Sequence, residues 1–153
     1  MSPTAYRPRL NHVAITVDPL VLNDRGRADV LSFYGEVFGW QEGDNTGEAG
    51  NPLILYTGSF GQFIYLLPAD PHLVAPALDH FGLQVSEVAD IEEPVGKAKA
   101  YQCRDNRVDI IDVHARVLPR GPVSYTLTSA YIGFLLPLMV ELQHIERHGP
   151  AGE

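Results

Sequence analysis

The fold is decided by an eight-residue stretch near the amino terminus, Asn11-His12-Val13-Ala14-Ile15-Thr16-Val17-Asp18. A later stretch repeats it in residue type, Asp79-His80-Phe81-Gly82-Leu83-Gln84-Val85-Ser86. Each reads polar, His, apolar, small, apolar, polar, Val, polar. Such self-similarity indicates that the chain is built from two copies of one structural unit.

Both stretches alternate with a period of two, which predicts a β-strand with one apolar face. Positions 13, 15 and 17 share the apolar face of the first strand, and positions 81, 83 and 85 share that of the second. The opposite faces carry His12 and His80, each followed by small or polar residues. A face of this kind suits the wall of a pocket better than a packed core.

A helix and further strands follow each of these two strands. Apolar residues at helical spacing predict one helix over 27–38, and a weaker pattern predicts another over about 90–102. The remaining alternating stretches predict strands at 52–57, 62–67, 108–117, 124–134 and 138–145. We therefore expect a single domain, residues 1–153, with internal repeat modules at about 9–68 and 77–146.

The last strands of the two halves also correspond to each other. Phe63-Ile64-Tyr65-Leu66-Leu67 matches Met139-Val140-Glu141-Leu142-Gln143, so Tyr65 and Glu141 occupy equivalent positions. A carboxylate in the middle of an apolar strand is costly unless it is paired or bound to a metal. We therefore expect Glu141 either to be paired with another group or to bind a metal.

The composition excludes several classes of function. The chain has 19 acidic and 11 basic residues in 153, a net charge of −8, which argues against nucleic acid or an anionic membrane as a partner. Its single cysteine, Cys103, excludes an intrachain disulfide and a multi-cysteine metal site. The sequence carries no apolar signal segment and no apolar run long enough to span a membrane, so we expect a cytoplasmic protein.

With these features the sequence resembles the vicinal oxygen chelate superfamily, which includes glyoxalase I, methylmalonyl-CoA epimerase, extradiol dioxygenases and bleomycin-resistance proteins. The resemblance covers residues 10–146, and the stretch at 33–40 is similar to the first helix of the family. It implies an α+β fold in which two βαβββ modules form a cupped, barrel-like mixed sheet, the glyoxalase/dioxygenase fold. By position it implies a metal ion held by His12, His80 and Glu141, with Tyr65 at a fourth ligand position.

Two histidines and one carboxylate form the ligand set of non-haem iron sites, and the same ligands serve Zn, Ni, Co or Mn. Iron is the first choice of metal, because the phenol of Tyr65 is a poor ligand and would leave a position open for oxygen. We therefore expect a metal-dependent enzyme acting on a small oxygenated substrate that chelates the metal. Dioxygenase-like chemistry is slightly preferred over isomerase, epimerase or lyase chemistry.

Further residues are candidates for contact with a substrate. Tyr65 is either a substrate-contacting phenol or general acid, or a packed aromatic residue at a vacated ligand position. Glu48 is a candidate catalytic base, since epimerase-like members use a Glu from a similar region, and a solvated loop residue is the alternative. His114, Tyr125 and Tyr131 are candidate substrate-binding residues of the second half, where a surface or core role is open for each.

The resemblance also implies a homodimer, because cupped sheets expose edges that pair across subunits. Whether the cup forms within one chain or between two is open at this point. The alternative function is a metal-free protein that binds an antibiotic or other small molecule between its modules, with aromatic walls and a preference for cationic ligands. The matched His12, His80 and Glu141 favour the enzyme, since sequestering members usually lack such a set.

Overall fold

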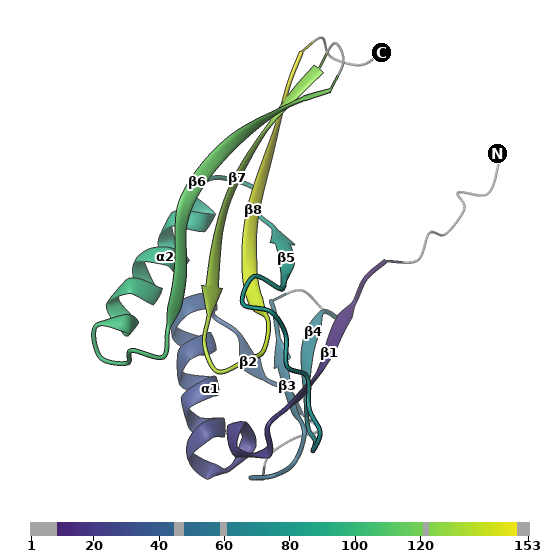
Figure 1. The fold of residues 1–153 in the computed structure, drawn as a ribbon, viewed down its shortest axis with the longest axis vertical. Coiled ribbons are helices and arrows are strands. Elements are labelled where there is room, and N and C mark those ends of the chain that lie inside the picture. Colours follow the sequence, from purple (N-terminus) through teal and green to yellow (C-terminus); the bar gives the residue numbers. More distant parts are fainter. Residues whose placement is uncertain (1–8, 45–47, 59–60, 121–122, 150–153) are drawn as a thin grey trace, which may run out of the picture.

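The structure is a computed structural model that describes residues 9–44, 48–58, 61–120 and 123–149 (Figure 1). The first half contains β1 (His12–Val17), a 3-10 helix η1 (Pro19–Leu22), α1 (Asp24–Phe38), β2 (Gln41–Glu42), β3 (Leu53–Tyr56) and β4 (Phe63–Pro68). The second half contains β5 (His80–Gln84), α2 (Ala89–Gln102), β6 (Asp109–Arg120), β7 (Val123–Gly133) and β8 (Met139–His148). The order βαβββ therefore occurs twice, and the predicted α+β class is confirmed.

Each half folds its own four-stranded mixed sheet. The strand orders are β1-β4-β3-β2 and β5-β8-β7-β6, so the first and last strands of each half pair in parallel. This pairing explains the matched sequences, because equivalent strands lie side by side in both sheets. The register places Ala14 beside Tyr65 and Gly82 beside Glu141. Among the described strands the sheets are cupped but do not close into a barrel.

Helix α1 begins and ends where its local sequence stabilises the ends. The side chain of Asn23 accepts a hydrogen bond from Gly26 N at 2.8 Å and so caps the first turn. Gly39 ends the helix with a φ of +71°, a conformation that glycine adopts without strain. Between these ends α1 buries Val30, Phe33, Tyr34 and Val37, the residues whose spacing predicts the helix.

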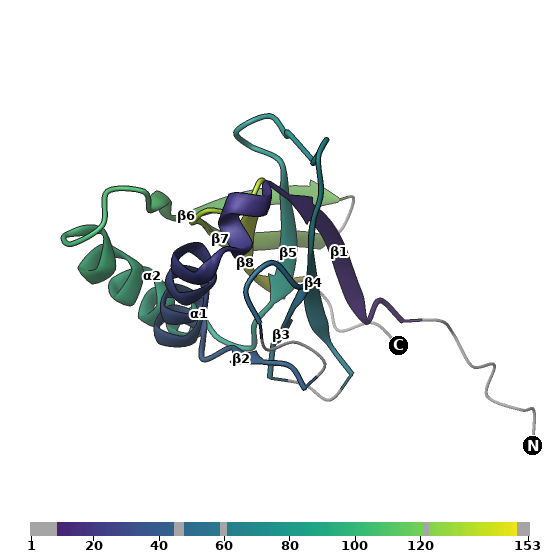
Figure 2. The ribbon, with the colours of Figure 1, turned by 90° about the horizontal axis from the view of Figure 1, so that it is seen from below.

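One hydrophobic core joins the two halves. Figures 1 and 2 show α1 and α2 side by side, away from the exposed faces of both sheets. The ring of Phe33 stacks on Phe134, in the turn between β7 and β8, at 4.4 Å between centroids. The hydroxyl of Tyr34 donates a hydrogen bond to the Phe134 carbonyl at 2.9 Å, and burial raises the pKa of this phenol far above its usual range. The first helix is thus anchored in the second half of the chain.

The strands of the second sheet differ greatly in length. Strands β6 and β8 run to Arg120 and His148, beyond the ends predicted for them at 117 and 145, whereas β5 spans only five residues. The outer parts of β6, β7 and β8 therefore project past β5 and α2 as a curved three-stranded extension, here called the arm (Figure 1). The arm consists of residues 115–120, 123–128 and 144–148. None of the helices in the described ranges is long and apolar enough to cross a membrane.

Candidate metal centre

His80 is oriented by a backbone contact that leaves one ring nitrogen open. Its Nδ1 lies 2.8 Å from the carbonyl oxygen of Leu78, which can only accept, so Nδ1 carries the proton. In the neutral ring the lone pair is then on Nε2, and this atom lies 3.4 Å from Oε2 of Glu141. Histidine ligands of metals are typically held in this way, with the second ring nitrogen hydrogen-bonded to a carbonyl or carboxylate.

Glu141 has one carboxylate oxygen committed to its neighbours and one that is not. Its side chain is buried, and Oε1 accepts hydrogen bonds from the Tyr131 hydroxyl at 2.9 Å and from Gln143 Nε2 at 3.1 Å. Oε2 faces His80 and the space above Gly82, where an added Cβ would lie 3.2 Å from it. Glycine at position 82 therefore keeps Oε2 accessible.

Tyr131 and His114 lie next to this pair. Burial, and secondly the hydrogen bond to Glu141, raise the pKa of the Tyr131 phenol, while the positive charge of Arg116 acts in the opposite direction. The His114 ring stacks on Tyr131 at 6.0 Å between centroids, and its Nδ1 lies 3.0 Å from the Asp112 carbonyl. A carbonyl again fixes the proton on Nδ1 and leaves a lone pair on Nε2. A bulge between Ile111 and His114 shifts the β6 register that positions this ring.

His12 has the same local arrangement but lies elsewhere in the chain. Its Nδ1 lies 2.8 Å from Asn11 Oδ1, and its ring stacks on Phe63 at 4.9 Å between centroids. It borders a groove of about 700 Å³ that is also lined by Phe81 and Leu142 but by neither His80 nor Glu141. In the described part of one chain, no three His, Cys, Asp or Glu side chains gather closely enough to hold a metal ion. A single chain therefore pairs His80 with Glu141 and leaves His12 apart.

The other candidate residues are also divided between separate regions. Tyr65 shares a sheet face with His12 through its register with Ala14. Glu48 is exposed in a loop that is tied to η1 through the hydrogen bond from Gly50 N to Leu22 O. Tyr125 shares the face of Tyr131 but lies six residues away along β7, or about 20 Å. Gln143 is not among the site residues predicted from the sequence, although its spacing of two from Glu141 puts it on the same face.

The His80–Glu141 pair fits a divalent metal. Two ligands at about 2.1 Å from one ion lie about 3.0 to 3.4 Å apart at octahedral to tetrahedral angles, and the Nε2–Oε2 distance of 3.4 Å is within this range. Imidazole nitrogen and carboxylate oxygen together suit Fe, Mn, Co, Ni and Zn. A third protein ligand is needed for the usual set of two histidines and one carboxylate.

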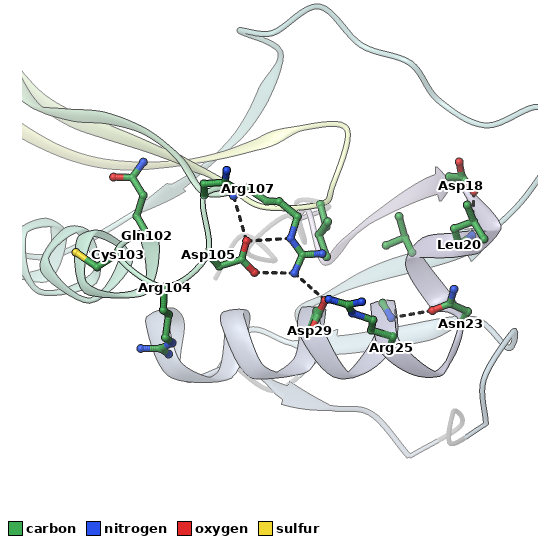
Figure 3. A pocket seen from close by; sticks show the side chains of 14 residues that line it. Asp18, Leu20, Asn23, Arg25, Asp29, Gln102, Cys103, Arg104, Asp105 and Arg107 are labelled. Carbon is green, nitrogen blue, oxygen red and sulfur yellow. Dashed lines mark hydrogen bonds and ion pairs between the residues drawn. The ribbon is translucent and has the colours of Figure 1, made fainter.

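A second groove, of about 820 Å³, lies between the start of α1 and the end of α2 (Figure 3). Arg107 spans it with ion pairs to Asp29 at 2.7 Å and to Asp105 at 2.6 Å. Hydrogen bonding to Arg107 lowers the pKa of Asp105 to about 2. The charges of Arg107 and the two carboxylates neutralise each other here. We therefore interpret these ion pairs as a structural connection between the ends of the two helices.

Comparison with known proteins places this fold among solved structures. The fosfomycin resistance protein FosX from Listeria monocytogenes superposes with a TM-score of 0.56 at 15% identity, over 91% of this chain and 94% of that one. A mutant of the same protein, complexed with Mn(II) and 1S,2S-dihydroxypropylphosphonic acid, gives 0.57 at 16% identity, over 90% and 92%. A glyoxalase/bleomycin resistance protein/dioxygenase from Nocardioides gives 0.56 at 15% identity, over 99% and 92%.

Sequence comparison alone finds no relative, since no family model and no curated protein matches the chain. The structural likeness extends over nine-tenths or more of this chain in all three cases. The repeated βαβββ unit and the two parallel β1–β4 and β5–β8 pairs are therefore features of a known fold. The chain shares the fold of FosX and of the glyoxalase/bleomycin resistance protein/dioxygenase structure, which is the fold that the resemblance of its sequence implies.

Proposed function

We propose that the chain is a divalent-metal-dependent enzyme, with the metal held by His80 and Glu141 of one copy and His12 of a second copy. The observation that carries the proposal is the contact of His80 Nε2 with Glu141 Oε2 at 3.4 Å, while Nδ1 and Oε1 are held by other groups. The substrate is a small molecule that binds the metal through adjacent oxygen atoms.

The position of His12 supports a contribution from a second copy. It is exposed at the start of β1, an edge strand that pairs with β4 and with no other strand of the described ranges. Its Nδ1 is held by Asn11, and its Nε2 makes no hydrogen bond within the described residues. The Nε2 of His80, in contrast, lies near Glu141. In a two-fold symmetric dimer each copy would offer His12 to its partner and receive the partner's, which makes two equivalent sites. The proposal therefore includes a homodimer.

The chemistry of the metal follows from this ligand set. Bound there, a divalent metal would polarise a substrate oxygen and stabilise negative charge on it. The similar fold that holds Mn(II) with a dihydroxypropylphosphonic acid supports both the choice of a divalent metal and a ligand with neighbouring oxygens.

His114 favours proton transfer as the reaction class. Its ring stacks on Tyr131 beside the site and its Nδ1 is held by the Asp112 carbonyl, so Nε2 is left to accept a proton from a bound substrate and return it. We therefore give isomerase, epimerase or lyase chemistry first place. Dioxygenase chemistry is the second candidate, because three protein ligands leave coordination positions open for a substrate and oxygen.

Metal content tests the proposal directly. Protein purified without chelator under anaerobic conditions should contain about one divalent ion per chain, and Glu141→Ala and His80→Ala should each remove it. Manganese, zinc, nickel or cobalt would favour proton transfer, and iron would favour oxygen chemistry. Failure to bind any of these ions after reconstitution would overturn the proposal in favour of a metal-free binding protein.

Mixing two inactive variants tests the origin of His12. His12→Ala and Glu141→Ala should each lose the metal when purified alone. In a mixed dimer, the His12 of the Glu141→Ala copy meets an intact His80–Glu141 pair, so one of its two sites is restored. Equal mixing and re-association should then recover about a quarter of the wild-type metal content. No recovery, with mixed dimers verified by mass, would place all three ligands within one chain.

A further inference from the structure

The sheet face that carries Glu141 continues outward along the arm. The register of β6, β7 and β8 places residues of the three strands side by side in successive rows. Moving away from Glu141, the rows are His114 with Ser129 and Gln143, then Arg116 with Leu127 and Ile145, then Leu118 with Tyr125 and Arg147. Paired residues of an antiparallel ladder point to the same side, so all nine share the face of the metal site.

This face is positively charged in a strongly acidic protein. Beyond Glu141 the three rows contain Arg116 and Arg147 and no Asp or Glu, although the chain has a net charge of −8. Neither arginine makes a hydrogen bond or ion pair with another described residue. The nearest carboxylate in sequence, Glu146, points to the opposite face, where it lies 3.9 Å from His148. Among the described residues, two guanidinium groups are thus left without counterions on the arm, in rows four and six residues from Glu141 along β8.

The spacing suits one ligand that reaches both regions. The row of Arg116 lies four residues from Glu141 along β8, or about 13 Å, and an extended arginine side chain covers about half of that distance. Tyr125 lies opposite Arg147 on β7, the strand between those that carry the two arginines.

We propose that Arg116, Arg147 and Tyr125 form an oxyanion subsite that binds a carboxylate or phosphate group at the far end of the substrate. Guanidinium groups bind such oxyanions through paired, charge-assisted hydrogen bonds. The enzyme then acts on an anionic small molecule with metal-binding oxygens at one end and an oxyanion at the other. The role of this subsite in turnover rests on the proposed function. Binding of an anion to the arm does not depend on that function.

Anion titration of the metal-free, full-length protein tests the subsite. Inorganic phosphate and acetate are titrated by calorimetry at constant ionic strength with sodium chloride. Arg116→Gln and Arg147→Gln should each raise the dissociation constant of the anion about tenfold, the loss expected for one charge-assisted contact. The matched control is Arg25→Gln, since Arg25 is exposed on α1 and makes no hydrogen bond or ion pair within the described residues. Tighter phosphate assigns a phosphate end to the substrate, and tighter acetate assigns a carboxylate.

Three results would overturn the subsite. The first is equal anion binding in Arg116→Gln, Arg147→Gln and Arg25→Gln. The second is no saturable binding of either anion to the wild type. The third is a change of oligomeric mass in the two arm variants, which would make the arm a contact between chains. Metal binding by the same variants is measured before the metal is removed. Failure of the metal site and failure of the anion subsite can then be distinguished.

Discussion

Gly82 lies directly beside Glu141 in the parallel register of β5 and β8, and a Cβ at position 82 would lie 3.2 Å from Glu141 Oε2. That separation is tighter than ordinary van der Waals contact, so either the carboxylate or the edge strand must shift to admit a methyl group. The absence of a side chain at position 82 thus leaves room beside Glu141 Oε2, the carboxylate oxygen that accepts no hydrogen bond from Tyr131 or Gln143.

Gly82→Ala should therefore weaken metal binding while the fold is kept. We expect the dissociation constant to rise about tenfold, a shift of about 1.4 kcal/mol, because a shift of either Glu141 Oε2 or β5 changes the geometry of the His80–Glu141 pair. Metal titration by calorimetry measures this change. Gly96→Ala is the matched control, since a Cβ at position 96 in α2 meets nothing within 4 Å. A similar loss of metal affinity in both variants would indicate a general effect of replacing glycine by alanine, and not the close contact of the new methyl group with Glu141.

Tyr131→Phe should also weaken metal binding, in this case because the Glu141 carboxylate is less well oriented. The variant removes the hydroxyl that donates to Glu141 Oε1 at 2.9 Å and leaves the ring in place. Loss of such an outer partner typically costs about 10- to 100-fold in metal affinity. Tyr56→Phe, a partly exposed tyrosine on β3, controls for the loss of a phenol. Unchanged affinity in Tyr131→Phe would mean that Gln143 alone orients Glu141.

The sequence predicts the parts of this site that follow from strand periodicity. His12, His80 and Glu141 can be singled out because two strands repeat in phase and because a carboxylate interrupts an apolar pattern. The separation of His12 from the other two cannot be read from periodicity. It depends on how Phe33 and Tyr34 pack on Phe134, a contact between residues about a hundred positions apart. The open nitrogen of His114 likewise depends on a bulge and a backbone carbonyl that no residue pattern specifies.

The ion-pair link between the helices should make stability depend on pH in the acid range. The pKa of Asp105 is lowered to about 2, first by its side-chain hydrogen bond to Arg107. A depressed pKa means that the folded state favours the charged carboxylate, so this contribution is present above the ordinary pKa near 4 and is lost as the pH falls toward 2.

Asp105→Asn should therefore lower the urea midpoint at pH 6 and make no difference near pH 2. The gap between wild type and variant is expected to close gradually between about pH 4 and pH 2, as measured by urea unfolding at a series of pH values. A gap that stays constant over this range would show that the loss comes from packing or hydrogen bonding and not from the charge of Asp105.

Tyr34 provides a test of the contact that joins the two halves. Its hydroxyl is fully buried and donates to the Phe134 carbonyl at 2.9 Å. Tyr34→Phe removes this hydrogen bond, while the Phe134 carbonyl still accepts one from Leu136 N at 2.7 Å, so the free energy of unfolding should fall by about 1 kcal/mol. Tyr101→Phe is the control, because the Tyr101 hydroxyl makes a longer bond of 3.3 Å to Ser32 in a partly exposed position. Its cost should be smaller, since water can replace the lost partner. Equal losses in the two variants, measured by urea unfolding, would show that the Tyr34 hydroxyl adds nothing beyond ring packing to the contact between α1 and the second half.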